Sequence, residues 1–478
     1  MAACGLVALP VAVHFLDKER IGLWSLISQM AGYLLFLELG VGAAAGRMLA
    51  EPLAANEQRG IDRAWSTLLT ILAAQAALIT VVGCCLTFWL VDCFKIPLAL
   101  AGDARFVWVG MTLMHALSFP MRAYTGVLLC QERFHWTLLI SGCTPWINLL
   151  GFAAMLALGW GLRSYVFAAL VVNLSQFAWM RHLLRQGPHR LHYQPSYASW
   201  QIAKPILGYS ASIMLWSIAP AIVGSIPSVV LGRTLGLESV SLYMVSYRAP
   251  QLVAMLALRS YHAFYPKLQN LHVTAQRDRF LRVFRLATAL SLAMSGLGLV
   301  VALWVNRYAV GVLSRPDYYA GDWTTLWFVL GFLVMAWGEH LGTLFIIAGK
   351  AKLVSVALLV EVGLMWVFAS WLCPRYGMAG VAAAIALTPL LVRIPYYAMV
   401  GPRSCGFSLR SLYGNAAVVL AAALLLILGT FLLFHPFDFP AAKSLGALSV
   451  LAAAAGGTSS CRRSWQDVVA LRVRKVES

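Results

Sequence analysis

GYLLFLELGVGAAAGR, residues 32–47, is almost wholly apolar, yet it carries Glu38 near its middle and ends on Arg47. Such a run is typical of a helix that crosses a bilayer, because about 20 apolar residues span the hydrocarbon core. A charged side chain at the centre of such a helix costs about 2.5–3.5 kcal/mol on insertion scales. Glu38 therefore requires either a partner or a function, and the rest of the chain indicates which.

The composition of the chain is that of a membrane protein. Of its 478 residues, 61% are hydrophobic and 11% are charged, with a mean hydropathy of +0.77. Soluble domains carry about 25% charged residues, so the chain lacks the polar surface of a soluble fold. The nine cysteines show no metal-binding spacing, and no nucleotide-binding or zinc-protease motif occurs. We therefore predict an all-α polytopic membrane protein that is not an enzyme and has no metal or other cofactor.

Apolar runs of spanning length predict about fourteen transmembrane helices. We place them near residues 1–15, 21–45, 64–91, 105–129, 136–158, 165–180, 209–232, 240–264, 284–305, 323–348, 353–373, 378–400, 411–434 and 444–460. The connections on one side then carry 22 Lys and Arg residues, against ten on the other. The positive-inside rule makes the first side cytoplasmic, so we expect both termini in the cytoplasm. The net charge of +18 thus orients the protein and does not indicate a nucleic-acid partner.

An internal repeat predicts two pseudo-symmetric lobes of six helices. LDKERIGLW (Leu16–Trp24) matches LGLESVSLY (Leu235–Tyr243) at an offset of 219 residues, and Gly161 matches Gly377 at an offset of 216. Weak internal symmetry is typical of two-lobed transporters that bind substrate between the lobes. We expect an N-terminal lobe (1–182), a proline-rich cytoplasmic linker (183–205), a C-terminal lobe (206–400), and an extra helix pair with a basic cytoplasmic tail (401–478). We also expect that the first helix, of only about 15 residues, is truncated.

Three segments resemble one known family. FLDKERIGLWSLISQMAGYLLFLELGVGAAAGRMLAE (residues 15–51), SVVLGRTLGLESVSLYMVSYRAPQ (228–251) and GKAKLVSVALLVEVGLMWVFASWLCPRYGMAGVAAAIAL (349–387) resemble Wzx-type polysaccharide, or O-antigen, flippases. The resemblance implies the fold of the multidrug/oligosaccharidyl-lipid/polysaccharide exporter superfamily. It also implies that an undecaprenyl-diphosphate-linked glycan is moved to the outer leaflet of a bacterial-type plasma (inner) membrane by alternating access, in O-antigen, lipopolysaccharide or related surface polysaccharide synthesis. The expected partners are this substrate, membrane lipids and polysaccharide assembly proteins, and we expect a monomer.

Arginines within the apolar runs are the candidate substrate-binding residues. Arginine suits a diphosphate because its planar guanidinium donates two hydrogen bonds and stays charged. Arg248 and Arg259 are eleven residues apart, about three helical turns, so they share one face of their helix with His262 nearby. Arg259 also lies near the helix end, where it could instead reach the cytoplasmic interface. The remaining candidates beside or within apolar runs are Arg122, Arg393 and Arg47.

Acidic residues within the apolar runs are candidates for H⁺ or Na⁺ coupling or for ion pairs. Glu38 and Arg47 are nine residues apart and face opposite ways on a straight helix, so they do not pair with each other. Glu38 shares its face with small residues, which indicates a close helix contact or a cavity wall, unless the helix is shifted and Glu38 sits at the interface. Glu339 and Glu361 are the other candidates.

Two alternative functions remain open. One is a cation-coupled multidrug exporter of the same fold, for whose cationic substrates an arginine-lined cavity would be a poor match. The other is a membrane glycan polymerase or ligase, which would require a large outer loop with catalytic residues. The longest outer loop expected here, residues 306–322, is short, which disfavours the enzyme.

Overall fold

The computed structural model describes residues 2–34, 37, 41–55, 57–131, 133–186, 191–405 and 409–434. Within them all regular structure is helical. The α-helices are α1 (Ala2–Phe15), α2 (Lys18–Leu34), α3 (Val41–Ala54), α4 (Gln58–Cys93), α5 (Leu98–Cys130), α6 (Phe134–Ala157), α7 (Ser164–Arg185), α8 (Trp200–Thr234), α9 (Leu237–His262), α10 (Tyr265–Val273), α11 (Arg277–Leu313), α12 (Asp322–Ile347), α13 (Ala351–Leu391), α14 (Arg393–Cys405) and α15 (Leu409–Phe434). Short 3₁₀ helices η2 (Gly161–Arg163), η3 (Pro195–Tyr197) and η4 (Pro316–Tyr318) connect some of them.

Several of these helices are suited to a bilayer. In the described part of the chain, five helical segments are long and apolar enough to cross a membrane. They are 58–93, 135–157, 277–313, 322–347 and the continuous stretch 351–401. The chain is therefore a multi-pass membrane protein, as its composition predicts. The count of fourteen spans stays a prediction, and the last expected span, 444–460, lies outside the described residues.

The chain divides into two compact units, each made of segments that are distant in sequence. Unit 1 comprises Met1–Ser246, Val310–Ala320 and Lys350–Ala384, and unit 2 comprises Tyr247–Ala309, Gly321–Gly349 and Ile385–Ser478. The lobes expected from the sequence are continuous stretches of chain, whereas these units are not. The division at residues 182 and 206 therefore stays a prediction.

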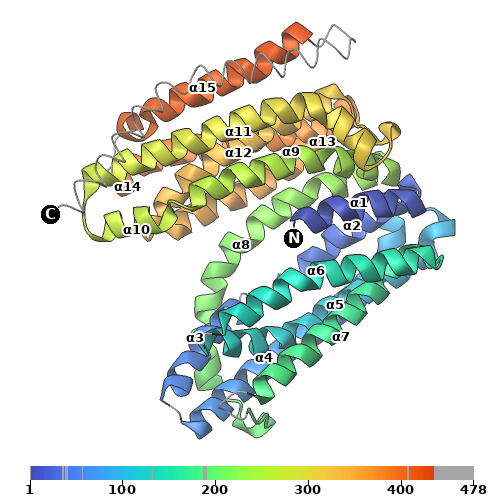
Figure 1. The fold of residues 1–478 in the computed structure, drawn as a ribbon, viewed down its shortest axis with the longest axis vertical. Coiled ribbons are helices and arrows are strands. Elements are labelled where there is room, and N and C mark those ends of the chain that lie inside the picture. The colour runs from blue at the N-terminus through green and yellow to red at the C-terminus, as the bar shows by residue number, and fades with distance from the viewer. Residues whose placement is uncertain are drawn as a thin grey trace. The chain divides into compact units, whose positions relative to one another are not determined.

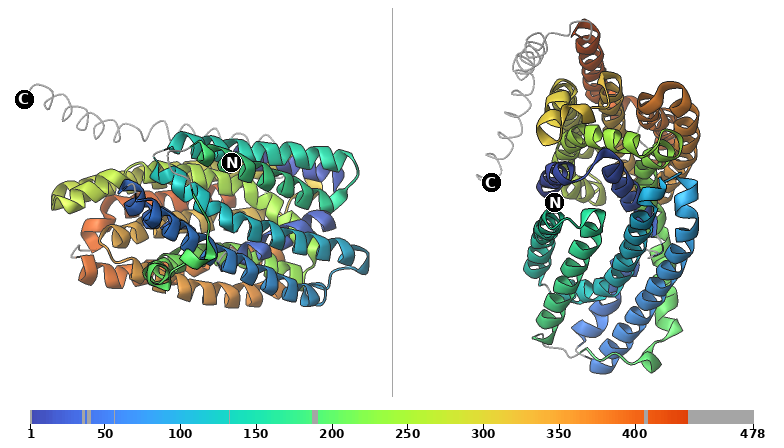
Figure 2. Two further views of the ribbon diagram at one scale, coloured as in Figure 1. Left: turned by 90° about the horizontal axis from the view of Figure 1, so that it is seen from below. Right: turned by 90° about the vertical axis from the view of Figure 1, so that its right-hand side faces the viewer.

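Unit 1 is built around the long helices α4 and α5, which run side by side, with α7 against α5 and α6 against α7 (Figure 1 and Figure 2). Its core contains Leu26 and Ile27 of α2 together with Trp108 and Phe119 of α5, all at most 1% exposed. The indole Nε1–H of Trp108 donates to the Gly83 carbonyl oxygen at 2.7 Å, which satisfies its polar atom within the core.

In unit 2, α11 and α12 lie close together (Figure 1), and α14 and α15 pack against α12. Small residues allow close approach: the Gly298 position on α11 faces Val253 of α9, and Gly296 faces Ala423 of α15. A buried cluster near the end of α9 joins Tyr261, Phe280 and Phe284. Close packing through glycine is typical of membrane helices, whose association relies on dispersion contacts.

Two glycines that the internal repeat pairs both have a positive φ angle. Gly161 has φ of 55° and Gly377 has φ of 58°, a left-handed region that other residues rarely occupy. Gly161 precedes α7, and Gly377 interrupts α13, so both lead into a new helical stretch. The glycine pairing at offset 216 therefore has a structural counterpart.

Two of the expected spans each contain the end of one helix and the start of the next. A single helix was expected over 21–45, but α2 ends at Leu34 and α3 begins at Val41. The expected span 378–400 contains the end of α13 at Leu391 and the start of α14 at Arg393, within the stretch 351–401 that is long and apolar enough to cross a membrane. This start places Pro395 in the first turn of α14, where its missing N–H costs nothing.

Candidate functional site

The α9 arginines lie within unit 2. The guanidinium of Arg248 is half-buried, and its Nη1 lies 3.5 Å from the Gln251 side-chain oxygen, while α9 continues unbroken through Pro250. Arg259 and His262, in the last turn of the helix, are exposed. The two arginines therefore differ in environment: Arg248 is constrained by its surroundings, whereas Arg259 has the freedom to reach an interface.

Arg393 and Glu339, proposed separately from the sequence, lie together in unit 2. Arg393 Nη1 is 3.9 Å from Glu339 Oε2, with the Arg393 side chain 4% exposed and that of Glu339 38% exposed. The pair thus joins the start of α14 to the middle of α12. Burial of a guanidinium is costly unless charge and hydrogen bonds compensate it, and Glu339 supplies part of that compensation.

A pair of glycines one helical turn apart makes room for this contact. A methyl group on Gly338 would lie 3.0 Å from Arg393 Cδ, and one on Gly342 would lie 3.3 Å from the Tyr397 hydroxyl. Gly338 and Gly342 form a G-x-x-x-G pattern, which allows close approach between membrane helices. The sequence analysis did not identify either glycine or Tyr397 as a site residue, although the G-x-x-x-G spacing indicates a close helix contact.

His340, next to Glu339 in sequence, belongs to a buried polar group. Its Nε2 lies 3.1 Å from Ser291 Oγ, and the Tyr261 hydroxyl donates to its backbone carbonyl oxygen at 3.3 Å. Ser291 in turn donates to the Ala257 carbonyl oxygen at 3.1 Å. The group connects α9, α11 and α12, so polar contacts as well as apolar packing fix the helix that carries Glu339.

The other cationic and acidic candidates of the N-terminal region are described only in part. Arg122, on α5 of unit 1, is half-buried with its guanidinium carbon 5.4 Å from the centre of the Phe119 ring, a cation–π distance. Arg47 lies on α3, but its side chain is outside the described part of the chain, and Glu38 lies outside it altogether. These candidates stay predictions.

Glu361 is fully buried on α13 of unit 1, at 0% exposure. The next two residues, Val362 and Gly363, line a cavity of about 450 Å³ between α2, α8 and α13, together with Met30, Tyr33, Ile222, Ile226, Val229 and Trp366. The cavity wall is thus mainly apolar. Its volume is within the usual range of ligand pockets, and its lining would suit an acyl chain better than a phosphate.

Comparison with known proteins adds information on the fold. No protein-family model matches the chain. Over 208 residues it is 21% identical to the capsular polysaccharide biosynthesis protein CapF of Staphylococcus aureus, a match that covers 44% of the chain and 52% of CapF. The match therefore spans about half the length of that relative.

Two solved structures share the fold across most of the chain. The lipid II flippase MurJ in its inward closed conformation has a TM-score of 0.73 at 14% identity, covering 98% of this chain and 97% of MurJ. An inward-facing multidrug resistance MATE family transporter of the MOP superfamily has a TM-score of 0.70 at 13% identity, covering 85% and 95%. This confirms the fold that the sequence motifs indicate. The chain is thus a multi-pass helical membrane protein with the fold of MurJ and the MATE transporters of the MOP superfamily.

Proposed function

We propose that the chain is a flippase that moves an undecaprenyl-diphosphate-linked oligosaccharide across the plasma membrane by alternating access, in the synthesis of a surface polysaccharide. The observation that carries the proposal is the likeness to a lipid II flippase over 98% of the chain, joined to a sequence match with a capsular polysaccharide protein. Both similarities concern glycans built in or on the bacterial envelope. Because the likeness to the flippase extends over 98% of the chain, it concerns the whole fold and not a single shared helix hairpin.

The positions of the candidate residues support an anionic, lipid-linked substrate. Arg248 is half-buried on α9 and Arg122 is half-buried on α5, so each unit carries a guanidinium within a helix rather than at its end. A diphosphate that crosses roughly 30 Å of hydrocarbon requires a water-accessible cavity with such cations, because the hydrocarbon itself cannot solvate its charge. Of these three arginines, Arg393 is the one most suited to a structural role, because its guanidinium lies beside the Glu339 carboxylate.

A cation-coupled multidrug exporter is the second candidate. It is favoured by the likeness to the MATE family transporter and by Glu339, a partly exposed carboxylate within α12 that could bind a proton or Na⁺. Glu339 is compatible with both functions, because a flippase also needs an energy source. The two proposals therefore differ in cargo and not in the role of this residue.

Deletion of the gene in its own host distinguishes the two cargoes. A flippase deletion should abolish the surface polysaccharide and trap the lipid-linked glycan on the cytoplasmic face, where periplasmic glycosidases and impermeant lectins cannot reach it. Tolerance to cationic dyes should stay unchanged, and expression of the natural chain should restore the polysaccharide. Unchanged polysaccharide with increased dye sensitivity would overturn the proposal in favour of the exporter.

A further inference from the structure

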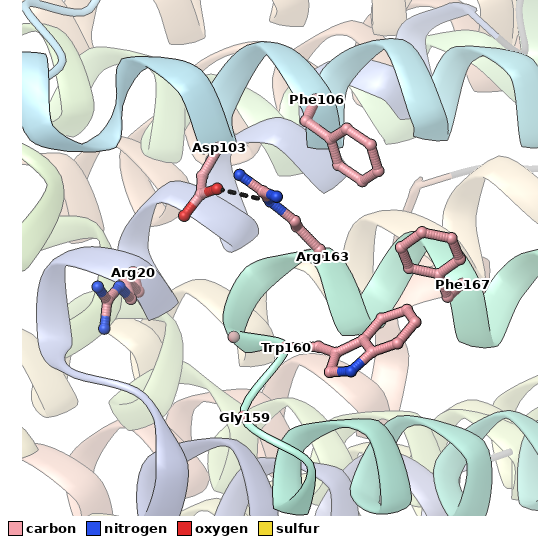
Figure 3. A pocket seen from close by; sticks show the side chains of 8 residues that line it. Arg20, Asp103, Phe106, Gly159, Trp160, Arg163 and Phe167 are labelled. Carbon is pink, nitrogen blue, oxygen red and sulfur yellow. Dashed lines mark hydrogen bonds and ion pairs between the residues drawn. The ribbon is translucent and has the colours of Figure 1, made fainter.

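A second pocket lies in unit 1, at the end where α5 begins and α6 leads into α7. It has a volume of about 580 Å³ and is lined by Arg20, Asp103, Phe106, Gly159, Trp160, Gly161, Arg163 and Phe167 (Figure 3). None of these residues is a candidate for substrate binding or coupling. The volume is within the range of small-molecule sites, which are typically concave with a few fixed polar groups among aromatic side chains.

Aromatic rings from two helices and a loop form the pocket wall. Trp160 and Phe106 are 45% and 38% exposed, so their rings are available to a ligand. The Trp160 ring stands edge-on to Phe167 at 4.8 Å between centroids, and Phe167 lies 5.9 Å from Phe106. Figure 3 shows the three rings gathered beside the Arg163 side chain.

The loop that carries Trp160 is held in a fixed conformation. The Gly159 N–H donates to the Leu156 carbonyl oxygen at 2.9 Å, and the Trp160 N–H donates to the Met155 carbonyl oxygen at 3.2 Å. With φ of 82° at Gly159, these two bonds form a Schellman motif at the end of α6. The indole is thus presented by a hydrogen-bonded turn, which lowers the entropic cost of binding a ligand to it.

Each arginine of the pocket lies beside a carboxylate. Arg163 Nε donates to Asp103 Oδ1 at 3.0 Å, and its guanidinium carbon lies 5.4 Å from the centre of the Phe106 ring. Arg20 Nη1 lies 3.4 Å from Asp17 Oδ2. Because each arginine has a carboxylate partner, the pocket offers fixed hydrogen-bond donors and acceptors without a strong positive field, which disfavours a phosphate ligand.

A pyranose sugar combines the two properties that this lining matches. Its ring carries a face of weakly positive C–H groups, which pack on the negative face of an indole, and an edge of hydroxyls, which bond to paired Arg and Asp side chains. We propose that this pocket binds one sugar unit of the transported glycan. The inference rests on the proposed function and adds a subsite for the sugar, separate from the residues proposed to bind the diphosphate.

The pocket lies at the end of unit 1 that the positive-inside rule assigns to the outer face. α4 begins beside the linker at Gln58 and ends at Cys93, and α5 starts from that far end at Leu98. Asp103 and Phe106 of α5 are therefore distant from the linker side. A sugar subsite there would hold the glycan after it has crossed the membrane, before its release.

Binding of soluble sugars to the purified full chain tests the proposal. N-acetylglucosamine, methyl galactoside and glucuronic acid are tested by saturation-transfer NMR in detergent, with glycerol phosphate as a lipid-headgroup probe. We expect at least one sugar to bind through its ring C–H groups. Trp160→Ala should weaken binding about tenfold or more, as truncation of a central tryptophan does, and Trp160→Phe should restore part of it. Trp89→Ala is the matched control, because Trp89 is 60% exposed on α4 outside the pocket and should bind within about twofold of the natural chain.

Three outcomes would overturn the sugar subsite. They are the absence of binding by every sugar, equal loss of binding in Trp89→Ala and Trp160→Ala, and binding of glycerol phosphate in preference to sugars. Deletion of the gene distinguishes a failure of the sugar-subsite proposal from a failure of the flippase proposal. If deletion abolishes surface polysaccharide while Trp160→Ala exports it at the normal rate and no sugar binds, the flippase stands and the subsite fails.

Discussion

The guanidinium of Arg393 lies 3.9 Å from the carboxylate of Glu339, and it is almost fully buried there. This contact joins the first residue of α14 to the middle of α12, at the point where Gly338 makes room for the arginine stem. Arg393, which the sequence offered as a substrate-binding cation, and Glu339, offered as a coupling or ion-pair carboxylate, therefore form one electrostatic unit.

Substitutions of Arg393 and Glu339 should have non-additive effects on the free energy of unfolding. We expect a double-mutant cycle of Glu339→Gln and Arg393→Gln to give a coupling energy of about 1–2 kcal/mol, between the values for exposed and buried pairs, because one partner is partly exposed. Unfolding in detergent–SDS mixtures measures it. Asp322→Asn is the control partner, because Asp322 lies 17 residues away at the start of the same helix, about 25 Å along its axis. That control cycle should be additive within about 0.5 kcal/mol, and an additive Glu339 cycle would show that the pair contributes nothing.

Gly22 should be intolerant of any side chain. A Cβ atom at this position would overlap the Leu237 carbonyl oxygen, at the point where α2 meets the first residue of α9. We expect Gly22→Ala to lower folded protein in the membrane several-fold, since a backbone carbonyl cannot move aside as a side chain can. Gly32→Ala is the matched control, because a Cβ there meets nothing within 4 Å. Equal expression of the two variants would contradict the close approach.

Gly22 also shows what the sequence could and could not predict. It stands in the IGLW motif that carries the family resemblance, and Leu237 lies in the matching repeat, yet the motif gave no indication that the two segments touch. The presence of a helix can be predicted from local hydropathy, and the turns at Gly161 and Gly377 can be predicted from the backbone preference of glycine. The Arg393–Glu339 contact depends on which helices are neighbours, and one sequence contains no such information.

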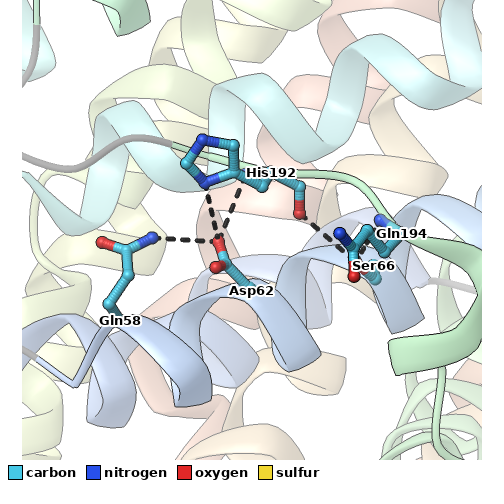
Figure 4. A network of polar contacts seen from close by, with 5 residues as sticks. All are labelled: Gln58, Asp62, Ser66, His192 and Gln194. Carbon is cyan, nitrogen blue, oxygen red and sulfur yellow. Dashed lines mark hydrogen bonds and ion pairs between the residues drawn. The ribbon is translucent and has the colours of Figure 1, made fainter.

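Backbone N–H groups of the linker after α7 donate hydrogen bonds to side-chain oxygens of α4 (Figure 4). The His192 N–H donates to Asp62 Oδ1 at 3.2 Å, the Gln194 N–H donates to Ser66 Oγ at 3.1 Å, and the Ser199 N–H donates to Thr67 Oγ1 at 3.0 Å. We expect Asp62→Ala to increase hydrogen exchange at His192 about fivefold or more, since loss of one hydrogen bond is worth about 1 kcal/mol. Asp62→Asn keeps an oxygen acceptor and should exchange nearly as slowly as the natural chain. Equal exchange in Asp62→Ala and the natural chain would remove Asp62 from this role.

A lysine at the start of α2 gives a prediction of pH dependence. Lys18 Nζ lies 3.0 Å from Asp317 and 3.2 Å from Glu238. The hydrogen bond to Asp317 raises the pKa of Lys18 above its ordinary 10.5 and lowers the pKa of Asp317 below its ordinary 3.8. The contribution of Asp317 to the free energy of unfolding is therefore complete above pH 3.8, and it is lost as the pH falls through the lower pKa of the folded state. The contribution of Lys18 is lost only as the pH rises through a value above 10.5.

Asp317→Asn should consequently destabilise the chain equally at about pH 5 and pH 8 and progressively less below the ordinary pKa of aspartate. The effect should be less than about 1 kcal/mol and should shrink with added salt, because the Lys18 and Asp317 side chains are 26% and 56% exposed. Unfolding curves of the two proteins across this pH range measure it. A difference that persists unchanged into strong acid would mean that Asp317 acts through shape and not through charge.

Arg248 should be the most sensitive of the proposed diphosphate ligands. Removal of a charge-assisted contact is worth about 1.5–3 kcal/mol, so Arg248→Ala should reduce affinity for the lipid-linked glycan about ten- to hundredfold. Arg248→Lys keeps the charge but loses the planar fork, and should fall between the natural chain and Arg248→Ala. Arg259 is exposed at the end of α9, so Arg259→Lys should be milder than Arg248→Lys. Export of glycan is measured at matched levels of membrane protein, which separates transport from folding.

The position of Arg248 can be tested without the substrate. In a chain freed of its nine cysteines, Arg248→Cys should react with a membrane-impermeant thiol reagent, because a residue that meets a diphosphate must be open to water. Leu256→Cys is a matched control on the same helix, since Leu256 is 69% exposed but apolar and suited to lipid, and its thiol should stay unreactive. Suppose that Arg248→Ala exports fully and the thiol at position 248 does not react. Arg248 would then face other helices, and the diphosphate would have to be held by different cations.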